Sequence, residues 1–117
     1  MVRNKILIGI VIFCLFSVAN AGSGWSQKGK IVEIYNFGWT IMVKLSGNPI
    51  DYSDGGACSD FSYYALNAKD NSKYDQLLSQ LLMAHALGLD TQFWISGNSC
   101  QGQNSNKQKI VTIRTFR

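Results

Sequence analysis

Residues 30–46 read KIVEIYNFGWTIMVKLS, two runs of β-branched and aromatic residues separated by one glycine. The first run, residues 30–37, has the composition of a β-strand. The second run, residues 39–46, alternates, and its apolar face consists of Trp39, Ile41, Val43 and Leu45. Because Gly38 favours a tight turn, we expect the two strands to form a hairpin with Trp39 in the core.

The remaining chain predicts three more strands and one helix. Strand-like composition marks residues 61–67, 91–96 and 109–116, and apolar side chains recur at helical spacing in residues 73–87. Residues 22–27 are expected to be a loose lead-in, and residues 47–60 and 97–108 to be loops. The order β-β-β-α-β-β predicts a mostly β fold with one helix, an OB-fold-like five-stranded barrel. Another small α+β sheet with this order is the alternative.

The start of the chain has the pattern of a secretory signal peptide. An apolar run at residues 6–18 follows a basic start and is too short to span a bilayer as a helix. The sequence Ala-Asn-Ala at residues 19–21 is a small-x-small cleavage site. We expect residues 1–21 to be removed, leaving residues 22–117 as a single secreted or periplasmic domain with no membrane span. An uncleaved membrane anchor is the alternative.

Cleavage would leave two of the three cysteines, Cys58 and Cys100. In an oxidising compartment an isolated pair usually forms a disulfide, which for a loop of this length contributes about 3–4 kcal/mol of stability. A metal or redox pair is the alternative, but His85 is the only histidine and no CxxC motif is present. We therefore expect no metal site and no cofactor.

Charge and motifs argue against several functions. The formal net charge is +4, and part of it belongs to the signal segment, so the domain is too weakly basic for a nucleic-acid partner. His85 falls on the apolar stripe of the predicted helix, which favours a hydrogen-bonded histidine at the core edge over a catalytic one. Asp51, Asp54 and Asp60 fit turn chemistry better than calcium binding or glycoside hydrolysis. We expect the protein not to be an enzyme.

Trp94 is the residue most suggestive of a ligand. In residues 91–96, Phe93 and Ile95 alternate with Trp94, so a buried first pair would turn the indole outward. An outward indole favours a cover, either a sugar ring, a neighbouring subunit or the following loop. If the cover is a glycan, we expect its hydrogen-bond partners to come from the neighbouring polar residues Gln92, Ser96 and Asn98.

The predicted helix also has an unusual outer face. Instead of lysines and glutamates, it carries the charge-poor set Gln76, Ser79, Gln80 and Met83. Such a face favours contact with protein, so we expect it to form an interface between copies of the chain. A merely neutral surface is the alternative.

The signal peptide, the Cys58/Cys100 pair, the single helix and the order of elements together resemble the B subunits of AB5 toxins, of the subtilase-cytotoxin and pertussis-like branch. The resemblance covers most of residues 22–117 at the level of element order, and no sugar-binding motif is carried over. It implies a homopentameric glycan-binding subunit whose helices line a central pore and which delivers a toxin A subunit. A secreted or periplasmic protein-binding module, such as an inhibitor or an assembly factor, is the alternative function.

Overall fold

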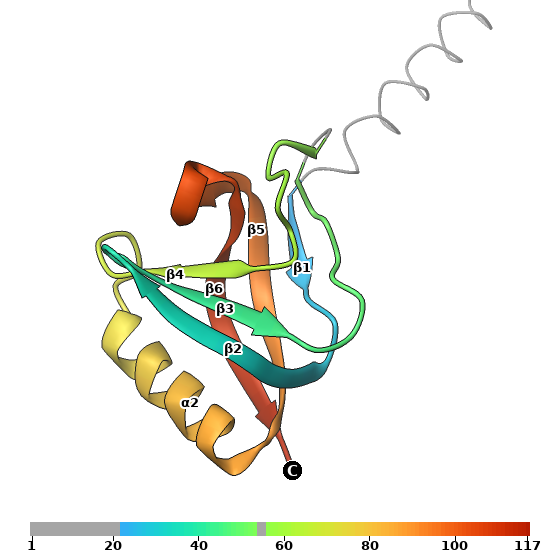
Figure 1. Ribbon diagram of the computed structural model, residues 1–117, viewed down its shortest axis with the longest axis vertical. Coiled ribbons are helices and arrows are strands. Elements are labelled where there is room, and N and C mark those ends of the chain that lie inside the picture. Colours follow the sequence, from blue (N-terminus) through green and yellow to red (C-terminus); the bar gives the residue numbers. More distant parts are fainter. Residues whose placement is uncertain (1–21, 54–55) are drawn as a thin grey trace, which may run out of the picture.

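The computed structural model describes residues 22–53 and 56–117. The expected signal peptide and its cleavage site lie outside these residues, as does Asp54. The elements follow the order β1 (Ser23–Trp25), β2 (Gly29–Phe37), β3 (Thr40–Leu45), β4 (Tyr64–Asn67), α2 (Tyr74–Leu87), β5 (Asp90–Gln101), η2 (Gln103–Ser105) and β6 (Lys107–Phe116). Within the described residues the fold is mostly β with one α-helix, and that helix lies between β4 and β5, as expected (Figure 1).

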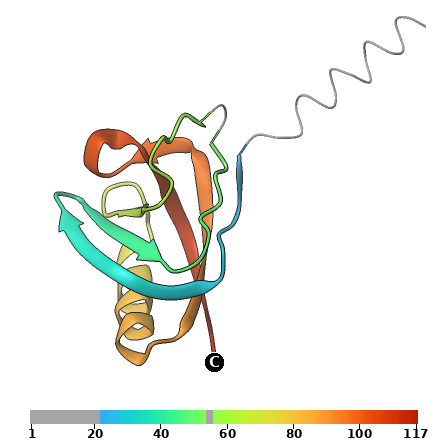
Figure 2. The same cartoon turned by 45° about the vertical axis from the view of Figure 1, so that its right-hand side comes forward.

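The strands form a six-stranded mixed sheet in the order β1-β5-β2-β3-β4-β6, and β5 and β6 also pair with each other. Five strands therefore make a ring, in which each strand bonds to two neighbours. β4 and β6 run parallel, and the other pairings are antiparallel. The turn of the sheet back onto itself is visible in Figure 2. Because β5 and β6 close the ring, the apolar strands expose few unpaired edges.

The core fills the ring and the space under α2. Fully buried side chains include Tyr64 and Phe93, whose rings meet edge to face with centroids 5.6 Å apart. The helix adds Leu77, Leu81 and Ala84 to this cluster. Gly88 ends the helix in the left-handed conformation, with φ 63°, as expected of a C-cap glycine. Burial raises the pKa of the Tyr64 phenol to about 12.

Two expectations about the first strands are wrong. Residues 22–27 are not a loose lead-in, because β1 pairs with β5 and brings Trp25 opposite Trp94. Trp39 is not in the core: it lies in the turn before β3, outside the alternating register, and is 63% exposed. The other residues of that face, Ile41, Val43 and Leu45, are buried as expected, but Thr40 and Met42 of the opposite face are buried too.

The last two strands are longer than expected. β5 continues to Gln101 and β6 begins at Lys107, so most of residues 97–108 belongs to the sheet rather than to a loop. By contrast, β4 begins only at Tyr64, three residues after the expected start. The extension of β5 carries Cys100 and forms one wall of the groove described below. Of the helices that the structure describes, none combines the length and the apolar composition needed to cross a membrane.

Candidate functional site

A groove of about 490 Å³ separates the tip of the β2–β3 hairpin from the β5–β6 connection. We call it the hairpin–loop groove. Its lining residues come from three places along the chain: Phe37, Gly38, Trp39, Thr40, Asn67, Ser99, Cys100, Gln101, Gly102 and Ser105. The two aromatic residues belong to the hairpin, Asn67 lies beside Thr40 as its strand partner, and Ser99, Gln101 and Ser105 belong to the end of β5 and the connection that follows it.

Trp39 and Phe37 give the groove its aromatic side. Their exposed fractions are 63% and 46%. The ammonium of Lys69 lies 4.2 Å from the centroid of the Trp39 ring, a cation–π contact that restrains the exposed indole. Thr40 supports the turn below, because its hydroxyl donates to the Phe37 carbonyl at 2.7 Å. The indole is thus held in position while much of its surface stays open to solvent.

The β5–β6 connection is held closely against the outside of the ring. Gly102 has φ 78°, and a Cβ there would lie 2.6 Å from Met42 Sδ, so this backbone needs glycine. The Tyr35 hydroxyl donates to Gln103 Oε1 at 2.9 Å, and Lys107 Nζ donates to the Gln103 carbonyl at 2.8 Å. These contacts explain why Met42 is fully buried although it points away from the core.

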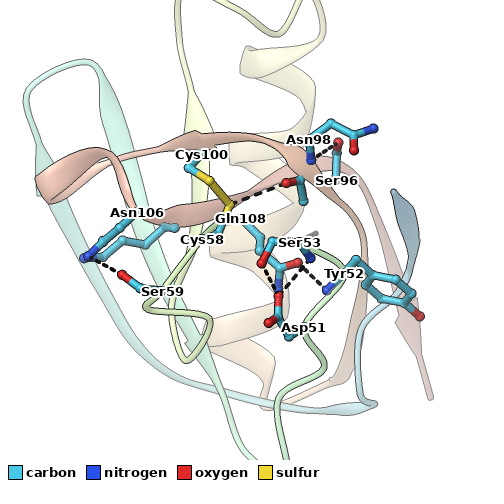
Figure 3. The surroundings of a disulfide bond; sticks show 12 residues. Asp51, Tyr52, Ser53, Cys58, Ser59, Ser96, Asn98, Cys100, Asn106 and Gln108 are labelled. Atoms are coloured by element: carbon cyan, nitrogen blue, oxygen red, sulfur yellow. Dashed lines mark hydrogen bonds between the residues drawn. A yellow bond between two sulfur atoms is a disulfide. The ribbon is translucent and has the colours of Figure 1, made fainter. Parts of the chain in front are cut away.

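The disulfide Cys58–Cys100 confirms the expected pairing, with a sequence separation of 42 (Figure 3). Cys58 is fully buried, and Cys100 stands in the wall of the groove. The bridge ties the long segment between β3 and β4 to the end of β5. Such a bond is typical of proteins that fold in an oxidising compartment.

A second anchor for the same segment comes from Gln108. This side chain is fully buried, accepts from the Tyr52 backbone N–H at 2.7 Å and donates to the Ile50 carbonyl at 2.8 Å (Figure 3). A third anchor is the ion pair between Lys107 Nζ and Asp60 Oδ2, at 3.2 Å. Burial raises the pKa of Asp60, but hydrogen bonds from Ser62 and Lys107 outweigh it and lower the pKa overall.

The polar side of the groove is built on Gln101. Its Nε2 donates to Asp70 Oδ2, while its Oε1 is buried without a hydrogen-bond partner among the described residues. Asp70 also accepts from Lys109 Nζ at 2.9 Å, and the hydrogen bonds from Lys109 and Gln101 lower the pKa of this carboxyl group. The Asn67 side chain stands at the end of β4, where its Oδ1 accepts from the Lys69 backbone N–H. One polar atom of each amide is thus bonded to the protein, Gln101 Nε2 to Asp70 and Asn67 Oδ1 to Lys69.

The residues expected around Trp94 lie on and beyond the outer face of β5. Phe93 and Ile95 are fully buried, and Trp94 is half-buried on the opposite face, with its ring 5.3 Å from Trp25 in an edge-to-face contact. Gln92 shares that face, but its amide donates to the Ser26 carbonyl and accepts from Arg114. Ser96 is half-buried beside the exposed Asn98, whose N–H donates to the Ser96 hydroxyl at 3.3 Å.

Trp25, which lies in the segment expected to be a loose lead-in, also belongs to this face. It covers part of Trp94, and the Arg114 guanidinium stacks on it at 4.1 Å. Residues 23–26 read SGWS and carry no apolar alternation, so the sequence holds no signal for this strand, and the burial of Gly24 and Ser26 accompanies the pairing of β1 with β5. Gly24 is required because a Cβ there would lie 2.5 Å from the Tyr52 ring.

The expected interface on α2 is largely exposed. Gln76, Ser79 and Met83 face solvent, whereas Gln80 is half-buried and donates to the Ile113 carbonyl at 3.2 Å. His85 is exposed rather than at the core edge, although it has the expected hydrogen-bond partner, the Ile31 carbonyl, 3.2 Å from Nδ1. The prediction that His85 belongs to the apolar stripe of the helix is therefore wrong.

The described carboxylates between β3 and β4, Asp51 and Asp60, make the local hydrogen bonds that are typical of turns. The Asp51 carboxylate accepts from the backbone N–H and the hydroxyl of Ser53, and Asp60 accepts from the Ser62 hydroxyl. Within residues 22–53 and 56–117, no group of three histidine, cysteine or acidic side chains lies close enough to hold a metal ion.

Comparison with known protein families, with curated proteins and with solved structures finds no match to this chain.

Proposed function

We propose that this protein is an exported, non-enzymatic binding module that recognises a glycan in the hairpin–loop groove. The observation that carries the proposal is Trp39, an indole that is 63% exposed at the wall of a groove of about 490 Å³. A pyranose ring has one apolar C–H face and a rim of hydroxyls. The indole suits the first, and the side chains of Asn67, Ser99 and Gln101 suit the second.

The arrangement of the strands supports the same site. We propose that the ring is an OB-like barrel, with β1 and β2 together acting as its first strand. OB-folds bind oligonucleotides and oligosaccharides beside the loops that join their first two and last two strands. The hairpin–loop groove lies between the corresponding connections, at Gly38 and at Gly102. Fold alone does not assign a ligand, so the proposal depends on the groove residues.

The weak charge of the domain favours a glycan over a nucleic acid. A nucleic-acid site needs several cations along the backbone path. The groove itself is lined by neutral residues, with Lys69 at its edge over Trp39. An uncharged, amide-rich groove with an open indole fits a neutral sugar better.

The glycan site expected at Trp94 stays a prediction. Trp25 and Arg114 now stand beside it, and the Gln92 amide is already bonded to protein atoms, so fewer polar groups remain for a sugar. We therefore place the proposed site at Trp39 and treat Trp94 as its competitor in the same experiment.

Assembly would strengthen a weak single site. We propose, with the resemblance to AB5 B subunits, that copies associate through the exposed face of α2, forming a homo-oligomer such as a pentamer that could carry a toxin A subunit. One aromatic contact is worth about 0.5–1.5 kcal/mol. A ring that presents several sites to a cell surface gains avidity without any new contact.

A glycan array tests the proposal, with wild type, Trp39→Ala and Trp94→Ala compared at equal protein concentration. We expect wild type to bind and Trp39→Ala to lose about 2–10-fold in single-site affinity, with Trp94→Ala unchanged. Because Trp39 is exposed, the free energy of unfolding of the Trp39→Ala variant should stay within about 0.5 kcal/mol of the wild-type value. The reverse pattern would move the site to Trp94. If wild type binds no glycan, the protein-binding module becomes the better hypothesis.

A further inference from the structure

The molecule has an apolar end that the proposed glycan site does not use. A recess of about 530 Å³ opens where α2 and β6 finish, and its lining residues are Met83, Leu87, Leu89, Thr115, Phe116 and Arg117. Leu87 is 66% exposed and Met83 is 46% exposed. In Figure 1 the ends of α2 and β6 lie together at the bottom of the view. Exposed aliphatic side chains grouped in this way favour a partner that covers them.

Cations surround this recess. Lys28 Nζ lies 4.0 Å from the Phe116 ring centroid, and the Arg114 guanidinium lies 5.2 Å from it. Lys30 donates to the Gly88 carbonyl at the end of α2, and Arg117 lines the recess itself. All four cationic residues are exposed. We call this group, together with the recess, the basic–apolar end.

Acidic groups do not balance these cations. The Asp90 side chain is acidic and lies at this end, where it is paired with Lys30 Nζ at 3.0 Å. Lys28, Arg114 and Arg117 are left to contact π-systems, a neutral amide or solvent. The basic–apolar end therefore combines apolar surface with a net positive charge.

We propose that the basic–apolar end docks on the surface of a bilayer that contains anionic lipids. Leu87 and Phe116 enter the boundary between headgroups and acyl chains, while the surrounding cations meet phosphate groups. Aromatic and aliphatic side chains rimmed by lysine and arginine are the composition that interfacial binding requires. Each cation near an anionic leaflet contributes about fivefold in partitioning, converted from about 1 kcal/mol.

The charge argues against a second copy as the occupant. If two copies paired symmetrically through this end, the same patch would face itself and bring like cations together. This inference is independent of the proposed glycan site, because Trp39 and the basic–apolar end share no residue. The two proposals can therefore fail separately.

Flotation with lipid vesicles tests the inference. Protein purified from an exporting host, its processed N-terminus established by intact mass, is mixed with vesicles of phosphatidylcholine alone or of phosphatidylcholine with phosphatidylglycerol. We expect binding to the anionic vesicles only, weakened by added salt. Leu87→Gln should lower partitioning about tenfold and Arg117→Gln about fivefold. Both residues are exposed, so the variants should fold.

Matched controls change the same chemistry elsewhere. Val111→Gln replaces another exposed aliphatic residue, and Lys73→Gln removes an exposed cation next to the start of α2; both should bind as wild type does. The inference is overturned by equal binding to both vesicles, by no binding, or by equal loss in variants and controls. It is also overturned if light scattering shows self-association that Leu87→Gln abolishes, or if the end binds polyglutamate but no vesicle.

Discussion

Replacing the buried Gln108 by methionine should lower the free energy of unfolding, although methionine is the more apolar side chain. The side chain is fully buried in β6, and its carboxamide bonds to the Tyr52 N–H and the Ile50 carbonyl. Methionine has nearly the same length and volume, so the Gln108→Met variant leaves no cavity and removes only these two bonds. The long segment before β4 then keeps the disulfide at Cys58 and the ion pair at Asp60 as anchors.

The expected cost follows from the two backbone groups. The Tyr52 N–H belongs to a half-buried residue and loses its partner, which costs about 1–3 kcal/mol. The Ile50 carbonyl belongs to an exposed residue and regains water, so its loss is about 0.5–1.5 kcal/mol. The free energy of unfolding should therefore fall by about 1.5–4.5 kcal/mol. For a domain of this size, each kcal/mol lowers the melting temperature by about 4–8 °C.

Urea unfolding followed by circular dichroism measures the effect, with Val111→Met as the control because Val111 is exposed on β6. The control should stay within about 0.5 kcal/mol of wild type. Combining Gln108→Met with Cys58→Ala should give a non-additive loss, since both changes free the same segment. If Gln108→Met unfolds at the same urea concentration as wild type with the same m-value, the anchoring role assigned to this amide is wrong.

Other perturbations have equally definite outcomes. Cys58→Ala opens a loop of sequence separation 42 and should cost about 2–4 kcal/mol in urea unfolding, whereas two free thiols in periplasmic material would contradict the expected oxidation. The pKa of Tyr64 is about 12 in the folded state and 10.0 when unfolded. The resulting contribution to the free energy of unfolding is complete below pH 10 and is lost as the pH rises toward 12. Tyr64→Phe should therefore flatten this part of the pH–stability curve. Gln76→Glu should weaken assembly, measured by light scattering, because like charges would meet across the interface. It is preferable to Gln80→Glu, which also removes the hydrogen bond to the Ile113 carbonyl. A monomeric wild-type protein would exclude this interface.

Local patterns predicted the parts of the fold that depend on local order. Alternation in residues 91–96 predicts the buried positions of Phe93 and Ile95, because a half-buried strand must alternate. The helix was predicted almost to its bounds, since its apolar spacing and Gly88 are both local signals. The disulfide followed from the count of cysteines that remain after the expected cleavage.

The groove could not be predicted because it is made by tertiary contacts. Trp39 shares the apolar composition of β3, but the hairpin turn takes it out of the strand register and into solvent. The opposite wall depends on β5 running on to Gln101 and on Gly102 packing against Met42. Trp25 was missed for a related reason: a three-residue strand such as β1 becomes visible only through its pairing with β5.

The ring has a consequence for how the chain reaches its native state. β6 is the last strand in the sequence, and it pairs with both β4 and β5. Until it arrives, a growing chain presents two unsatisfied strand edges, and the partners that would cover them are not yet made. Closure of the sheet must therefore wait until residues 107–116 have been made. A chaperone that held β5 in the meantime would shield one of these two edges.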